Sequence, residues 1–279
     1  LLPDGSTVGF VVCAEGECPL VIVADRTRAV TRLAGLDDLR VARLGNRDLL
    51  LASTHSNWDT MQMFPVLSHT GSGVFVMWKD GRGDFVQNYW GQNLSEAGER
   101  LWDPLGVDLA DYGREQEKPT LVDKDGFRNE IVFAWCENIN GMHDIIAQKY
   151  SLAGSPLWGN LGNFVVQKDT TQTSPTLARF DNGGMVIAWE DYYDIESDIY
   201  YKYIKSDGTF VQVSPLGDVL NDAGKMQYNP LIVTHGNDAY ALWADGRSSG
   251  KTEILGLGLG SVEDVRIRHV YFLIGELSR

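Results

Sequence analysis

The clearest pattern in the chain is a short apolar run that ends in tryptophan and is followed, two residues later, by an acid. The stretch "MVIAWED", residues 185 to 191, is one example. Three other stretches have the same form, and their tryptophans lie 54 to 57 residues apart. The tryptophans are Trp78, Trp135, Trp189 and Trp243, and the acids are Asp80, Glu137, Asp191 and Asp245. A unit of about 55 residues therefore recurs along the chain.

Each unit predicts four β-strands. A first strand such as "PTLARF" leads into the turn "DNGG", in which glycine supplies a positive φ. The unbroken apolar run "MVIAW" is typical of a strand buried on both faces. A polar loop, an alternating strand such as "IYYKYI" and a short fourth strand complete the unit, and no segment shows helical periodicity. Four strands in about 55 residues are typical of one blade of a β-propeller.

The number of units predicts an all-β, five-bladed propeller of four-stranded antiparallel blades, because 279 residues hold about five units of this length. A partial propeller belonging to a longer chain is the alternative. The predicted blades of this single domain span residues 1–58, 59–116, 117–172, 173–226 and 227–279.

The first unit departs from the repeat. Cys13 stands where the tryptophan would be, and residues 39–54 predict an additional hairpin. Cys13 and Cys18 flank a predicted hairpin loop. Facing hairpin positions can meet disulfide geometry, so the two residues are either a disulfide or two ordinary small apolar side chains.

The net charge of −14 narrows the possible partners. So acidic a surface repels phosphate backbones and anionic lipids, which argues against nucleic-acid binding and against binding to a membrane surface. No stretch approaches the roughly 20 apolar residues of a membrane span, so membrane insertion is not expected. The composition is typical of a soluble protein, including one from an extracellular setting.

The repeat resembles a known type of propeller module. W-x-D, a polar loop, a strand ending in Gln or Tyr and then G-x-x-L-W, as in "GERLW" and "GSPLW", are similar to tandem propeller repeats of large secreted or surface proteins from Bacteroidetes-type bacteria. The resemblance covers roughly residues 60–260. It implies a bacterial extracellular or cell-surface location and says little about activity, because those modules largely have unassigned ligands.

The acids after the tryptophans allow two functional interpretations. Every unit carries the same acid in the same place, which favours a structural role such as capping the following loop through backbone N–H groups. This leads to the expectation of a non-enzymatic module that binds a carbohydrate or protein ligand, or forms part of a larger assembly. The alternative is a five-bladed glycoside hydrolase or lyase that uses carboxylates from several blades, with Asp80, Glu137 and Asp191 as candidates.

The stretch 190–198 is more acidic than its counterparts in the other units. It holds five carboxylates and no positive charge. Oxygen clusters of this kind suit Ca²⁺, which predicts a calcium site made of Asp191, Asp194, Glu196 and Asp198, with a solvated acidic loop as the simpler interpretation. Tyr192 and Tyr193 lie in the same predicted loop, where tyrosines suit sugar or peptide binding; packing between strands is the alternative.

Overall fold

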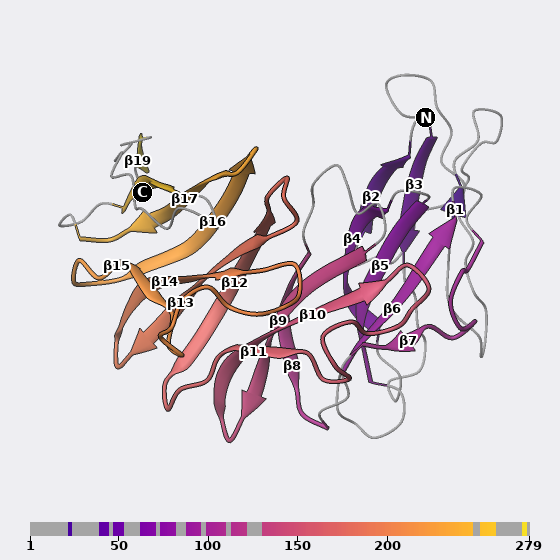
Figure 1. Ribbon diagram of the computed structural model, residues 1–279, viewed down its shortest axis with the longest axis horizontal. Coiled ribbons are helices and arrows are strands. Elements are labelled where there is room, and N and C mark those ends of the chain that lie inside the picture. Colours follow the sequence, from indigo (N-terminus) through magenta and orange to yellow (C-terminus); the bar gives the residue numbers. More distant parts are fainter. Residues whose placement is uncertain are drawn as a thin grey trace. The chain divides into compact units, whose positions relative to one another are not determined.

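The computed structural model is all β within the residues that it describes, which confirms the predicted fold class at this level. Those residues are 22–23, 39–44, 47–52, 62–70, 73–81, 88–95, 99–109, 113–121, 130–247, 252–260 and 275–277. Strands and turns account for their regular structure (Figure 1). Accordingly, these residues include no helix of the length and apolarity needed to cross a membrane.

Four antiparallel sheets of four strands follow one another along the chain, and in each sheet neighbouring strands are consecutive in sequence. They consist of β4 (Gln62–Thr70), β5 (Gly73–Asp80), β6 (Asn88–Ser95) and β7 (Val107–Asp108); β8 (Gln116–Leu121), β9 (Glu130–Ile139), β10 (Met142–Ser151) and β11 (Asn163–Val166); β12 (Thr171–Arg179), β13 (Met185–Tyr193), β14 (Glu196–Ile204) and β15 (Asp218–Asn221); and β16 (Gln227–His235), β17 (Asp238–Asp245), β18 (Thr252–Leu259) and β19 (Gly275–Leu277).

A three-stranded sheet precedes them, made of β1 (Ile22–Val23), β2 (Leu39–Leu44) and β3 (Arg47–Ala52) in the order β1-β3-β2. Strands β2 and β3 pair from Leu44↔Arg47 to Leu39↔Ala52, so the hairpin expected in this region is confirmed over residues 39–52. Cys13 and Cys18 lie outside the described residues, and their disulfide stays a prediction.

The chain divides into two compact units. The first comprises residues 1–116, 123–131 and 149–161, and the second comprises residues 117–122, 132–148 and 162–279. The candidate site described below lies wholly in the second unit, which contains the β12–β15 and β16–β19 sheets.

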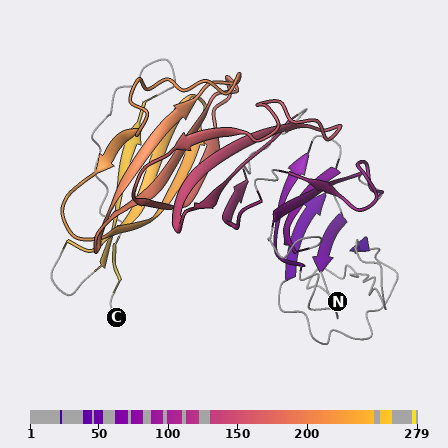
Figure 2. The same cartoon turned by 90° about the horizontal axis from the view of Figure 1, so that it is seen from below.

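The core of the second unit is the contact between these two sheets. Strand β13 is buried along nearly all its length, as its apolar run predicts. Val186, Ala188 and Tyr201 on one face of the β12–β15 sheet join a cluster with Ile232 and Trp243 of the next sheet, and Figure 2 shows the two groups of strands side by side. Trp135, Trp189 and Trp243 are fully buried, whereas Trp78 of the first unit is half-buried.

The first strand of every four-stranded sheet begins with a further repeated feature, the sequence Gln-x-x-Pro. The four copies are residues 62–65, 116–119, 172–175 and 227–230. In the pairs β4–β5, β12–β13 and β16–β17, the register between the two strands shifts within this tetrapeptide or directly after it, as it does at a β-bulge. The residue before proline has a positive φ in three copies, at Lys118, Ser174 and Asn229.

Candidate functional site

The acidic stretch 190–198 is a β-hairpin, and the prediction of a polar loop there was wrong. Strands β13 and β14 pair as far as Tyr193↔Glu196, which leaves a two-residue turn at Asp194 and Ile195. Because side chains alternate across a strand, the carboxylates are divided between the two faces of the sheet. The cross-strand pair Asp191↔Asp198 lies on one face.

The two tyrosines of the hairpin are divided in the same way. Tyr193 is 77% exposed and shares the face of Asp191 and Asp198. Tyr192 is half-buried on the opposite face. Burial, followed by the charge of Glu190 and a hydrogen bond to it, raises the pKa of Tyr192. Only Tyr193 is therefore presented to a ligand approaching the acidic face.

The structure does not gather the predicted calcium ligands Asp191, Asp194, Glu196 and Asp198 into a metal site. Among the residues it describes, no group of three or more His, Cys, Asp or Glu side chains could hold a metal ion. The positive charge near Asp191 comes from the chain itself. Lys168 Nζ lies 2.7 Å from Asp191 Oδ2, and the Thr170 hydroxyl donates to Asp191 Oδ1 at 3.0 Å.

In the other three sheets, the acid after the tryptophan accepts a hydrogen bond from that tryptophan. The indole N–H donates to Asp80 at 2.8 Å in the first unit. In the second unit, the corresponding bonds reach Glu137 at 2.9 Å and Asp245 at 3.2 Å. All three acids are fully buried, and Asp191 is buried as well, so burial does not separate the candidates; Asp80 and Glu137, two of the three candidates of the enzymatic alternative, differ from Asp191 in being bound by their own tryptophans.

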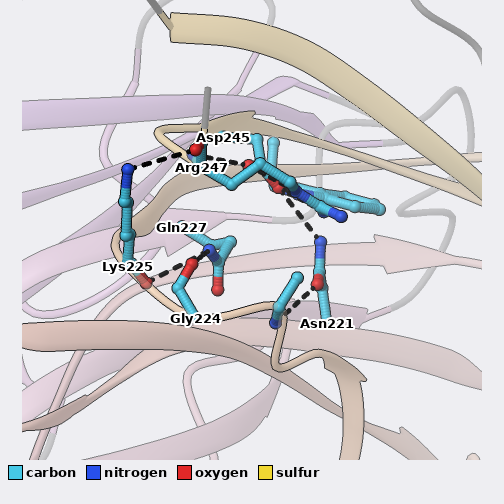
Figure 3. A network of polar contacts seen from close by, with 8 residues as sticks. Asn221, Gly224, Lys225, Gln227, Asp245 and Arg247 are labelled. Atoms are coloured by element: carbon cyan, nitrogen blue, oxygen red, sulfur yellow. Dashed lines mark hydrogen bonds and ion pairs between the residues drawn. The ribbon is translucent and has the colours of Figure 1, made fainter. Parts of the chain in front are cut away.

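The Asp245 carboxylate shows the most complete form of this arrangement (Figure 3). Besides the Trp243 indole, it accepts hydrogen bonds from Asn221 Nδ2 at 3.2 Å and from Arg247 at three positions: the backbone N at 3.0 Å, Nε at 2.8 Å and Nη2 at 2.6 Å. The backbone bond caps the following residues, as expected of this acid from the sequence. The neighbouring Gln227 side chain donates to the Gly224 and Lys225 carbonyls at 3.1 Å each.

Asp191 departs from this arrangement. The chain reads "WADGR" at 243–247 but "WEDYY" at 189–193, so the equivalent of Arg247 is missing. Asp191 instead bonds Lys168 and Thr170, which precede its sheet. The Trp189 indole N–H is buried and has no hydrogen-bond partner among the residues that the structure describes. The cation beside Asp191 is therefore a lysine with a partly exposed side chain from the connection before β12.

The surroundings of Asp198 complete the candidate site. Burial, and after it the negative charges of Asp222, Asp191 and Glu196, raise the pKa of the Asp198 carboxyl. Lys168 Nζ also lies 4.9 Å from the ring centroid of Tyr200, the residue paired with Trp189. A carboxyl with a raised pKa thus lies opposite a carboxylate bound to an ammonium group. Acid–base catalysts use pairs with unlike environments of this kind.

Lys168 and Tyr200 were missed by the sequence reasoning. Lys168 lies 23 residues before Asp191, and no local motif connects the two. The only available signal was indirect: the Gly-Arg of "WADGR" is absent after Asp191, so its carboxylate needs a different cation.

No protein-family model matches the chain, and no curated protein sequence matches it. The fold is similar to that of solved structures. The ulvan lyase of polysaccharide lyase family PL25 has a TM-score of 0.58 at 7% identity, over 98% of this chain and 70% of the lyase. The endo-arabinase of Bacteroides thetaiotaomicron has a TM-score of 0.41 at 13% identity, over 97% of this chain and 94% of the enzyme. The subtype N10 neuraminidase-like protein of A/little yellow-shouldered bat/Guatemala/060/2010 has a TM-score of 0.47 at 11% identity, over 78% of this chain and 60% of that protein.

The comparison with the ulvan lyase corrects the interpretation of the chain as a non-enzymatic module. The lyase, with which the chain shares its fold, is a polysaccharide lyase. Acids at equivalent positions also have different partners: Asp245 is bound by Arg247, two residues along the chain, whereas Asp191 is bound by Lys168 from the connection before β12.

Proposed function

We propose that the chain cleaves polysaccharides as a glycoside hydrolase, with its catalytic pair on the β13–β14 hairpin. The observation that carries this proposal is the pair Asp191 and Asp198, which lie directly opposite each other with unlike partners. Asp198 donates its proton to the leaving glycosidic oxygen. Asp191, itself buried and held by Lys168, stabilises through space the positive charge that develops on the sugar ring, and water adds to the anomeric carbon and returns a proton to Asp198.

The register supports the spacing that this chemistry needs. Directly opposed residues of an antiparallel pair have Cβ atoms about 4.5–5.5 Å apart. The two carboxyl groups of retaining glycosidases lie about 5–5.5 Å apart. Tyr193, exposed on the same face, provides an aromatic surface on which a sugar ring can stack.

The charge at the site favours a neutral glycan as the substrate. Asp191, Asp198, Glu196 and Asp222 contribute negative charge around one lysine, Lys168. A uronate group would be repelled here, whereas a neutral sugar would not. We further propose that the four-stranded sheets belong to a five-bladed propeller and that the enzyme acts outside the cell or at its surface, where polysaccharides are found.

The experiment is a screen for the release of reducing sugars from neutral and uronic-acid-containing polysaccharides, followed by kinetics of Asp198→Asn. We expect kcat on a neutral glycan to fall by about 10²–10⁴-fold. The matched control is Glu253→Gln, because Glu253 occupies the same register position opposite the enclosed Asp245; its kcat should stay within about threefold of wild type.

Two results would contradict the proposal. Equal losses in Asp198→Asn and Glu253→Gln would show that the acids act through the fold alone. Cleavage confined to uronic-acid polymers, with an unsaturated sugar product detected by its ultraviolet absorbance, would identify a lyase instead.

A further inference from the structure

Near its start, the first strand of each four-stranded sheet carries the Gln-x-x-Pro sequence, and the residue before the proline differs from one sheet to the next. In the second unit, the Gln-x-x-Pro glutamines are fully buried and hold the preceding connection. Gln172 Nε2 donates to the Thr170 carbonyl at 2.8 Å, and Gln227 Nε2 donates to the Gly224 carbonyl at 3.1 Å. The prolines that end the feature, Pro175 and Pro230, are buried as well. Both positions between the glutamine and the proline vary, and we call the one before proline the bulge residue.

The three bulge residues of this unit are Lys118, Ser174 and Asn229, with φ of 48°, 52° and 53°. Glycine adopts this conformation most easily, yet none of the three is glycine. Each carries a side chain with polar groups that are able to hydrogen-bond, and Lys118 and Asn229 are exposed while Ser174 is half-exposed. Non-glycine residues in this region of φ are uncommon and cluster at functional sites.

Contacts between sheets fix two of the three bulge residues, Lys118 and Asn229, to neighbouring sheets. Lys118 Nζ donates to Thr173 Oγ1 at 2.6 Å, which joins β8 to β12. The backbone N–H of Asn229 donates to Glu190 Oε1 at 2.6 Å, which joins β16 to β13. Strands β12 and β16 are themselves neighbours. Because Glu190 is buried, the position of Asn229 is fixed by a group that is itself held in the core.

Thr170 connects the start of β12, where the bulge residue Ser174 lies, to Asp191 of the proposed catalytic pair. Gln172, two residues before the bulge residue Ser174, donates to both the carbonyl and the hydroxyl oxygen of Thr170. The same Thr170 hydroxyl donates to Asp191. The start of β12 and the acidic face of the β13–β14 hairpin therefore share a hydrogen-bond network.

We propose that Lys118, Ser174 and Asn229 form a recognition row that binds the hydroxyl groups of an extended, neutral oligosaccharide. An ammonium, a hydroxyl and an amide group offer the donors and acceptors that sugar hydroxyls need. A constant backbone that presents different polar side chains is a means of setting specificity without altering the fold. This inference rests on the proposed function, because the row would position the glycan that Asp191 and Asp198 cleave.

The test replaces all three bulge residues with glycine, which removes the side chains and keeps the positive φ. Binding of the neutral polysaccharide identified in the activity screen is measured by affinity electrophoresis and calorimetry, in the Asp198→Asn background so that cleavage does not interfere. We expect the Kd to rise at least about tenfold, from the loss of several hydrogen bonds. Circular dichroism and thermal melts should show a retained fold.

The matched control is Lys225→Gly, which removes an exposed lysine of positive φ from the connection before β16; its Kd should be unchanged. A triple variant that binds as tightly as its parent would overturn the recognition row and leave the proposed hydrolase intact. If Asp198→Asn cleaves like wild type, the catalytic assignment fails, while the Kd of the triple variant still decides the row. A wild-type protein that binds no glycan overturns both.

Discussion

Replacing Asp245 with asparagine tests whether the repeated acid is a structural element of the sheet. The carboxylate is fully buried and accepts five hydrogen bonds, from the Trp243 indole, the Asn221 amide and three groups of Arg247. Asparagine preserves the shape of the side chain but removes its charge. It also turns an NH₂ group toward donors that need an acceptor.

The expected loss of stability follows from the partners. A hydrogen bond to a charged group contributes about 1.5–3 kcal/mol. The Arg247 side chain is 39% exposed, so water compensates for part of its lost interaction and its share lies at the low end. The Trp243 indole has no such alternative, because its side chain is buried. Together these terms predict that Asp245→Asn lowers the free energy of unfolding by about 3 kcal/mol at neutral pH.

The loss of unfolding free energy in Asp245→Asn should be smaller at acidic pH than at neutral pH. Burial on its own would raise the pKa of Asp245, but the hydrogen bonds from Arg247 and Trp243 outweigh burial and bring the pKa below its ordinary value. The folded protein therefore holds this proton less tightly than the unfolded chain. The stabilisation is present above the unfolded pKa, about 3.9, and is lost as pH falls through the folded pKa. The difference between wild type and variant should narrow below about pH 4.

Urea unfolding followed by tryptophan fluorescence measures both quantities. A double-mutant cycle with Arg247→Met separates the contribution of the arginine from that of Trp243 and Asn221. A loss below about 1 kcal/mol, or a loss that is the same at pH 3 and pH 7, would refute a structural role for this carboxylate.

Three further substitutions test two features that set the β12–β15 sheet apart. Because the Trp189 indole has no hydrogen-bond partner among the described residues and the Trp243 indole has one, Trp243→Phe should lower the unfolding free energy by about 1–2 kcal/mol more than Trp189→Phe in urea titrations. Burial lowers the pKa of Lys202 to about 8, so the unfolded chain binds this proton more tightly and stability should rise with pH above about 8. In thermal melts between pH 8 and 10, Lys202→Gln should flatten that rise of stability with pH. Glutamine suits the site because Gln92 occupies the equivalent position in the β4–β7 sheet. An unchanged slope would show that another group causes the rise.

The strand content of the fold was predictable because burial imposes a strict pattern on it. A strand covered on both faces needs an unbroken apolar run, and β13 shows that run in its sequence and its burial. The same reasoning failed at residues 190–198, where acids and tyrosines were interpreted as a loop. Aspartate and glutamate are poor strand formers, but pairing with the partner strand determines the conformation here.

A second repeated feature was visible in the sequence but could be explained only from the packing. Gly106 and Gly217 each stand 28 residues after a tryptophan, in the repeated sequence "PLG". Both have a positive φ. A Cβ at Gly106 would lie 2.8 Å from the Trp78 ring, and one at Gly217 would lie 2.6 Å from the Trp189 ring. The glycine is required because the indole fills the space of its side chain, and this contact between distant parts of the chain has no local sequence signature.

The candidate site could not be predicted because it depends on which cation reaches each acid. All four acids look alike in the sequence, and for Asp80, Glu137 and Asp245 the structural interpretation agrees with their tryptophan partners. The cation that reaches the fourth, Asp191, comes from a different segment, and its reach depends on how the connection before β12 folds against the sheet.

The change of cation has a chemical consequence at the surface of the sheet. Arg247 binds Asp245 through two side-chain nitrogens and its own backbone, so that carboxylate has no remaining capacity for a ligand. Lys168 is a single charge on a flexible side chain, and it lies between the Asp191 carboxylate and the Tyr200 ring. A molecule that displaces or rebinds the ammonium group would change the charge felt by Asp191 and Asp198 together. In the β13–β14 hairpin, the buried Asp191 is thus paired with a lysine that can move away from it, whereas Asp245 of the β16–β19 sheet is paired with an arginine bound at three positions.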